Sequence, residues 1–133
     1  MHSKYDEIQE ILDDYKQELP EVEPEWPYKV QSAYVFIYEH LFDPRLTVGW
    51  MKQKHRINGK SFAAQFHKSV GTYPKSYILH HRIAASKHLL QQTGASITQI
   101  ALAVGFRSLS AFCNTFKSKE GIQPTKWQRS KQN

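Results

Sequence analysis

Cysteine is almost absent from this sequence, since Cys113 is the only one among 133 residues. A lone thiol excludes an intrachain disulfide and a zinc site built from several cysteines. Long apolar runs are also missing, because none approaches the roughly 18 residues of a membrane-spanning helix. The acidic N-terminus lacks the apolar core of a signal peptide. The sequence therefore predicts a soluble protein of a reducing, cytoplasmic compartment, with no membrane partner.

Carboxylates are scarce over most of the chain. Residues 29–133 hold sixteen Lys and Arg but only Glu39, Asp43 and Glu120, a formal charge of +13, whereas residues 1–28 hold two lysines and nine carboxylates, a charge of −7. A metal-dependent nuclease needs clustered carboxylates, and no Ser-His-Asp or Cys-His motif is present. We therefore expect no enzyme, and the basic body indicates a polyanionic partner.

The histidines do not form a metal-binding pattern. His80, His81 and His88 lie on one predicted helix without an i, i+4 pair or a neighbouring carboxylate. Such positions are typical of surface or packing histidines rather than metal ligands. We expect no metal ion and no other cofactor.

The most informative stretch is 96–127, which predicts a helix, a tight turn and a second helix. Ser96 and Gln99 match a capping box at the start of the first helix. Gly105 lies in the turn, and Gly121 suits a left-handed position at the end of the second helix. Two short helices joined by a turn with a glycine describe a helix-turn-helix.

The same pattern occurs earlier in the chain, 50 residues before. The matched pairs are Phe62 and Phe112, Phe66 and Phe116, Gly71 and Gly121, Pro74 and Pro124, and Tyr77 and Trp127. Before the turn the offset is 49, because the second copy has one more turn residue, Arg107. Arg56 occupies the position of Gly105, so we expect a wider or strained first turn. The recurrence predicts two helix-turn-helix units in tandem.

Apolar spacing, caps and breakers divide the rest of the chain. The predicted elements are an acidic helix over 3–19, a linker rich in Pro and Glu over 19–27, a support helix over 29–42, a helix over 47–55, and a helix capped by Asn58 that ends near Gly71. Pro74 opens the longest helix, 74–92. At 1.5 Å per residue it spans about 28 Å, which approaches the ~34–36 Å of one turn of B-DNA.

These elements predict an all-α fold of about seven helices, preceded by an acidic N-terminal helix or tail. The expected division is an N-terminal helix and linker over 1–28 and a main domain over 29–133. Within the main domain we expect a first lobe over 29–73, a central helix over 74–92 and a second lobe over 95–130.

The main domain resembles the DNA-binding domain of the AraC/XylS family of bacterial transcription regulators. The matching residues are Phe66, Gly71, Pro74, Tyr77, Arg82, Leu89-Leu90, Ile100-Ala101, Val104-Gly105-Phe106, Phe112, Phe116-Lys117, Gly121 and Pro124. The resemblance implies a seven-helix, two-lobed domain that inserts one recognition helix per lobe into successive major-groove turns of double-stranded DNA. It also implies that a monomer can bind DNA, and that the protein activates transcription by contacting RNA polymerase.

Position within the two units predicts the residues that face DNA. The base-reading candidates are Lys60, Ala63, Ala64, His67, Leu109, Ser110, Cys113 and Asn114. Asn114 is the strongest of these, since its amide can pair with adenine N6 and N7. Leu109 also suits core burial, and Cys113 also suits inert packing. The candidates for phosphate contact are Lys68, Lys75, Arg107 and Lys117.

Several alternatives stay open at this point. The basic body also fits a helical interaction module that binds an acidic protein. The helix over 3–19 is either solvated and partly frayed, or a docking helix or shield that competes with DNA for the basic surface. A face formed by Ile8, Leu12 and Tyr15 also suits a contact with polymerase or another partner. The chain is either a small stand-alone regulator or a fragment of a larger protein.

Overall fold

The computed structural model describes residues 3–58 and 60–132, which form eight helices and no strand. The helices are α1 (Lys4–Gln17), α2 (Tyr28–His40), α3 (Val48–Lys54), α4 (Ser61–Val70), α5 (Pro74–Gln92), α6 (Ile97–Ala103), α7 (Leu109–Glu120) and α8 (Pro124–Ser130). The predicted all-α fold is confirmed. Within the described residues, no helix has the length and apolar character to cross a membrane.

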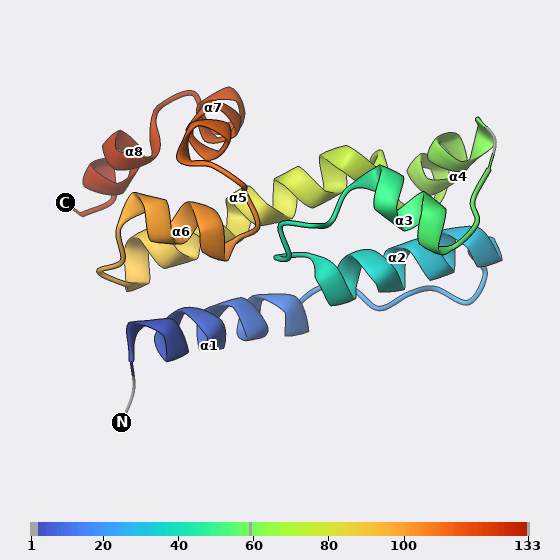
Figure 1. Cartoon of the computed structure of the whole chain (residues 1–133), viewed down its shortest axis with the longest axis horizontal. Helices are drawn as coiled ribbons and strands as arrows, with labels where there is room; N and C mark the ends of the chain where they lie inside the picture. The colour runs from blue at the N-terminus through green and yellow to red at the C-terminus, as the bar shows by residue number, and fades with distance from the viewer. Residues whose placement is uncertain (1–2, 59, 133) are drawn as a thin grey trace.

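The helices enclose two hydrophobic cores that share α5 (Figure 1). In the first core, Met51 of α3 and Phe66 of α4 pack against α2 and the start of α5. In the second, Phe112 and Phe116 of α7 pack against α6, α8 and the later part of α5. These phenylalanines are buried because apolar residues recur every three or four positions on one side of each helix.

Most predicted helix ends are confirmed. Ser96 Oγ accepts the backbone N–H of Gln99 at 3.1 Å, and the Ser96 N–H donates to Gln99 Oε1 at 2.9 Å, so the capping box is complete. The prediction for Asn58 is wrong, because the N-cap of α4 is Lys60 and no side chain caps it. The N-cap residue directly precedes the first residue of a helix, and Asn58 lies two residues before the cap position that Lys60 occupies.

The two turns repeat each other in backbone geometry. The Ile57 N–H donates to Lys52 O at 2.8 Å, and the Phe106 N–H donates to Ala101 O at 3.0 Å. Both turns need a left-handed residue, and Arg56 (φ 52°) takes the place that a glycine fills in the second copy. The strained first turn is therefore confirmed, since an arginine in this region costs about 1–3 kcal/mol.

The acidic helix α1 is docked rather than frayed. Ile8 and Leu12 are only 6% and 2% exposed and belong to the second core. In Figure 1, α1 lies on the side of α5 opposite to α4 and α7. The interpretation of this segment as a frayed helix is therefore wrong, and α1 does not lie over α4 and α7. The apolar stripe of α1 finds a complementary surface on α5, which periodicity alone does not reveal.

Tyr15 of α1 contacts a half-buried histidine of α5, His81. The two are joined by a 2.6 Å hydrogen bond between the Tyr15 hydroxyl and His81 Nδ1. Burial raises the pKa of Tyr15 to about 12, so the hydroxyl stays protonated and shares this hydrogen bond with a neutral imidazole. Burial, together with the neighbouring His80, lowers the pKa of His81 to about 4.

We expect the free energy of unfolding to fall as the pH drops from 6.5 toward 4. In this window the unfolded chain, with an ordinary histidine pKa near 6.5, binds a proton that folded His81 does not. Between pH 7 and 4.5 the loss from His81 is about 2 kcal/mol. Urea unfolding of the parent, His81→Gln and, as control, His88→Gln at both pH values measures it. A pH dependence unchanged by His81→Gln would contradict the prediction.

Candidate nucleic-acid interface

The two helices α4 and α7 lie on the same side of the central helix α5 (Figure 1). Phe62 and Phe66 of α4 are 3% and 0% exposed, and their counterparts Phe112 and Phe116 are both fully buried. The opposite face of each helix is therefore turned away from its core, as the sequence pattern predicts. This duplicated outward face is the candidate interface.

On the first lobe the outward face is exposed along its length. All four predicted base-reading residues of this lobe are exposed to solvent, namely Lys60, Ala63, Ala64 and His67. The ring of His67 lies 4.5 Å from the ring of Tyr73, which is 52% exposed. Sequence reasoning missed Tyr73, although an aromatic residue directly before the helix-opening Pro74 was the available signal. With two alanines in its centre, this face offers few hydrogen-bonding groups.

On the second lobe the outward face is more polar. Leu109, at 42% exposed, points outward rather than into the core. Ser110 and Asn114 are exposed, and in the part of the chain that the structure describes no hydrogen bond engages the Asn114 amide. Cys113 is half-buried, and burial raises the pKa of its thiol, so it stays protonated and poorly reactive.

Three of the four predicted phosphate contacts are exposed lysines. Lys68 and Lys117 lie in the last turns of α4 and α7, and Lys75 is the second residue of α5. Arg107 has a different position, because its Nε donates to Pro44 O in the first lobe at 3.1 Å. The extra turn residue of the second copy thus ties the two lobes together, a role that the sequence repeat did not reveal.

Arg82 of α5 forms the main polar link between the lobes. It is 6% exposed, its Nε donates to Leu41 O at 2.9 Å, and its Nη2 donates to Asp43 O at 2.9 Å. Burial lowers the pKa of the guanidinium to about 10, so it remains charged at neutral pH. The turn at Gly105 packs directly on this guanidinium. Arg82 therefore holds the second turn against the end of α2.

A carboxylate in the same connection is kept ionised by an adjacent arginine. Asp43 Oδ2 lies 2.7 Å from Nη2 of Arg45, which lowers the pKa of Asp43 to about 2. Farther along, Lys87 Nζ lies 3.1 Å from Glu120 Oε1. Two of the few carboxylates of the main domain are thus engaged with cations, and the reading faces of α4 and α7 carry none before Glu120.

Two tri-helical units on one central helix, each with a short helix, a tight turn and an exposed second helix, define a helix-turn-helix DNA-binding domain. A family model described as "Helix-turn-helix domain" matches residues 53–130, which include α4 to α8. The chain belongs to this family, in its AraC-type branch of transcription regulators, as the sequence resemblance indicated. The family consists of DNA-binding regulator domains, so the prediction that the chain is not an enzyme is confirmed.

Individual relatives agree with this assignment. The chain is 33% identical over 105 residues to the melibiose operon regulatory protein of Escherichia coli, a match that covers 79% of this chain and 34% of that protein. The chain spans between 34% and 38% of the length of this and two further bacterial regulators that it matches.

Two solved structures share the fold. The C-terminal domain of AraT, a response regulator from Geobacillus stearothermophilus, has a TM-score of 0.72 at 21% identity, with 80% of this chain and 88% of that chain covered. The DNA-binding domain of AdpA, a global transcriptional factor solved in complex with a target DNA, has a TM-score of 0.67 at 20% identity, with 77% and 91% covered.

Proposed function

We propose that the chain is a sequence-specific regulator of transcription in the cytoplasm that reads double-stranded DNA with α4 and α7. The carrying observation is the duplicated outward face of these two helices on one side of the molecule. The rod α5 between them has 19 residues, about 28 Å, which approaches one turn of B-DNA. One copy of the chain then suffices to contact successive major-groove turns.

Charge and fold both support DNA as the partner. The formal charge of +13 on residues 29–133 favours a polyanion and steers association at low salt. The similar AdpA domain was solved with its target DNA. Exposed Lys68, Lys75 and Lys117 supply the contacts to phosphate that set register without reading sequence.

The two helices read DNA unequally in this proposal. Asn114 pairs with an adenine in the second half-element, while Lys60 donates to guanine O6 and N7 in the first. Ala63 and Ala64 offer only methyl contact to thymine. The first lobe therefore relies more on the shape of the groove than on hydrogen bonds.

We propose that the chain acts as an activator by contacting RNA polymerase beside the promoter. The AraC-type family assignment supports this, since its members mostly activate transcription in this way. With α4 and α7 on one side, the opposite side that carries α1 stays accessible to a protein when DNA is bound.

Selection of bound duplexes from a random library, followed by footprinting, tests the proposal. We expect two protected major-groove segments on one side of the duplex, about one helical turn apart. Protection of a single segment, or no preference over random competitor DNA, would overturn it. Binding to an acidic protein that survives high salt, with negligible DNA affinity throughout, would favour an interaction module instead.

Asn114→Ala is expected to relax the preference at one base pair of the second half-element. The lost bidentate contact costs about 1–3 kcal/mol with the preferred base and little with the others. Titration of duplexes that carry each base at this position measures the effect. The exposed amide Gln91, on α5, provides the control, and Gln91→Ala should leave the preference unchanged. Equal weakening by Asn114→Ala on every duplex would remove Asn114 from the readers.

A further inference from the structure

The N-terminal residues 4–26, here called the strap, contact both lobes of the DNA-binding domain. At one end, Ile8 and Leu12 of α1 are buried in the second core. At the other end, Leu19, Val22 and Trp26 pack against the first core. The strap therefore runs from one lobe to the other, although it precedes both in the sequence.

The first-lobe end of the strap is held by hydrogen bonds as well as packing. The Tyr34 hydroxyl of α2 donates to the backbone carbonyl of Pro20. Gln31 Nε2 donates to Trp26 O at 2.8 Å and to Pro24 O at 3.1 Å, and the Trp26 ring lies 5.2 Å from that of Tyr34. A proline-rich stretch has few backbone donors of its own, so these side chains give it a defined path.

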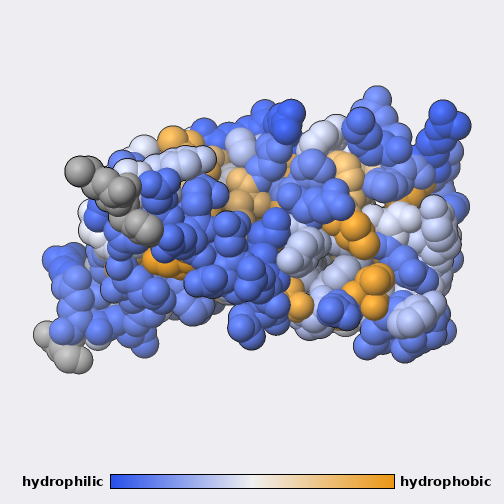
Figure 2. Space-filling view, turned by 90° about the horizontal axis from the view of Figure 1, so that it is seen from below, coloured by the Kyte–Doolittle hydropathy of each residue, from blue (hydrophilic) through white to orange (hydrophobic). Residues whose placement is uncertain are grey.

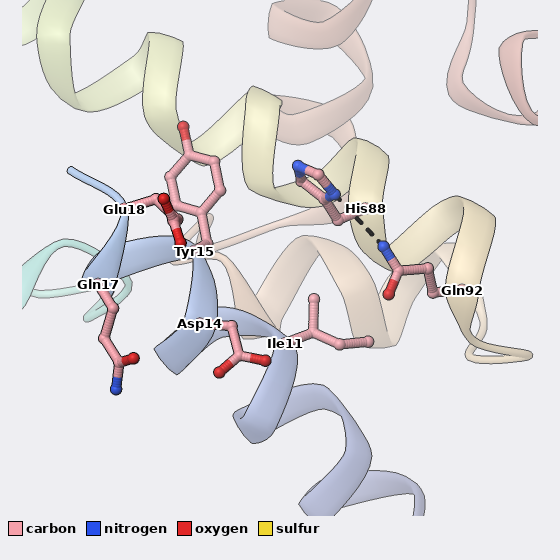
Figure 3. Close-up of a pocket in the computed structure, with 7 residues that line it drawn as sticks. All are labelled: Ile11, Asp14, Tyr15, Gln17, Glu18, His88 and Gln92. Carbon is pink, nitrogen blue, oxygen red and sulfur yellow. Dashed lines mark hydrogen bonds between the residues drawn. The ribbon is translucent and has the colours of Figure 1, made fainter.

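Tyr15 fixes the middle of the strap at the boundary between the lobes. Besides its hydrogen bond to His81, its ring lies 6.2 Å from Phe42, a residue that packs against both cores. It also lies 5.8 Å from the ring of His88 farther along α5. Figure 3 shows Tyr15 and His88 bordering a hollow between α1 and α5.

The strap lies on the side of α5 opposite to α4 and α7 (Figure 1). Figure 2 shows this face, which is largely hydrophilic where α1 lies and has hydrophobic side chains nearer α2. At the lobe boundary, Arg82 of the central helix α5 and Arg107 of the second lobe donate to backbone carbonyls of the first lobe. The lobes are thus joined at their boundary by the two arginines and across their outer face by the strap.

We propose that the strap is a positioning element for DNA recognition, which sets the spacing between the two half-elements that the chain accepts. This inference rests on the proposed two-helix reading of DNA. Two lobes held rigidly bind two DNA elements at one separation, and no conformational entropy is lost in orienting the lobes. When the separation changes, only one lobe can contact its element. Lobes freed from the strap tolerate other separations and bind the correct one less tightly.

The test compares the selected DNA site with a site that carries two extra base pairs between its elements, a rotation of about 70°. The measured quantity is the ratio of the affinities of the full chain for the two sites. Leu12→Ala loosens the second-lobe end of the strap, and Trp26→Ala loosens the first-lobe end. We expect each to lower the ratio about fivefold or more, the lower end of typical coupling between sites.

Two further variants keep the test decisive. Asp13→Asn changes the exposed side of α1 next to Leu12 and should leave the ratio unchanged. Tyr15→Phe removes only the hydrogen bond to His81. It replaces Leu12→Ala and Trp26→Ala in the test if either of these variants does not fold, and it should also lower the affinity ratio.

The possible outcomes separate the strap from the proposed function. If the parent chain binds DNA equally well without the second half-element, the proposed two-helix reading itself is refuted. A parent that discriminates spacing, with a ratio unchanged in Leu12→Ala, Trp26→Ala and Tyr15→Phe, refutes only the strap. Partial unfolding weakens both sites by the same factor and leaves the ratio unchanged, so a merely structural role counts against the inference. Tighter binding to both sites in the variants and in Asp13→Asn would show competition between the acidic segment and DNA instead.

Discussion

Replacing Gly105 with alanine is expected to lower the free energy of unfolding by about 3–5 kcal/mol. The residue has φ 105°, which costs alanine about 1–3 kcal/mol. In addition, the new Cβ would lie 2.8 Å from Cζ of Arg82. That guanidinium is buried and donates to Leu41 O and Asp43 O, so moving it breaks hydrogen bonds worth about 1.5–3 kcal/mol each.

The chain contains a matched control for this substitution. Gly71 has nearly the same backbone angle, φ 101°, but no atom lies within 4 Å of a Cβ added there. Gly71→Ala should therefore show the backbone cost alone. Urea unfolding of both variants isolates the steric part, which we expect to be about 2 kcal/mol or more. Equal decreases in the free energy of unfolding for Gly105→Ala and Gly71→Ala would mean that the Arg82 guanidinium moves aside without an energetic cost.

A double variant locates the cause of the loss in the guanidinium. In Arg82→Met the side chain keeps an apolar stem but loses the group that a Cβ at position 105 would meet. The combined cost of Gly105→Ala and Arg82→Met should then be clearly less than the sum of the two single costs. Additive costs would place the effect of Gly105→Ala in the backbone rather than in the contact with Arg82.

Phe112→Ala is expected to cost about 3–5 kcal/mol of stability, because it leaves a cavity in the second core. The ring is fully buried, and its centroid lies 5.4 Å from that of Phe106 and 5.7 Å from that of Phe116. Since a domain of this size is stabilised by roughly 5–15 kcal/mol, the variant should approach the limit of folding. Chemical and thermal unfolding measure the loss.

Leu109 supplies the comparison for this prediction, since it lies on the same helix and faces outward at 42% exposed. Leu109→Ala should change stability by no more than about 0.5 kcal/mol, as expected for a surface position. If Phe112→Ala were as stable as the parent while Leu109→Ala were not, the faces of α7 would be rotated relative to the structure. The proposed base-reading residues would then be wrong as well.

Local features of the sequence were enough to predict most of the helices. The start of α5 at Pro74, the capping box of α6 and the left-handed end of α7 at Gly121 all follow from interactions within a few residues. The inward faces follow from apolar spacing, and the strained turn at Arg56 follows from comparing the two copies. Such features can be predicted from the sequence because the groups that interact are close together in it.

Apart from the misplaced cap at Asn58, the errors and omissions involve groups that are far apart in the sequence or in different elements. The docking of α1, the ring contact between Tyr73 and His67 and the hydrogen bond from Arg107 to Pro44 each depend on where a chain segment lies in space. Leu109 stayed ambiguous for the same reason, because its spacing suits both burial and exposure until α6 and α8 are placed.

The sequence by itself determined the helices, their inward sides, the twofold repeat and the basic charge of the main domain. Only the tertiary structure decided that α4 and α7 share one side, that the acidic strap lies on the other, and that Arg82 joins the lobes. The physical reason is the separation along the sequence of the groups that interact. Caps, turns and periodicity act within one or two helical turns, whereas the relative placement of lobes depends on contacts such as that between Arg82 and Leu41, 41 residues apart in the chain.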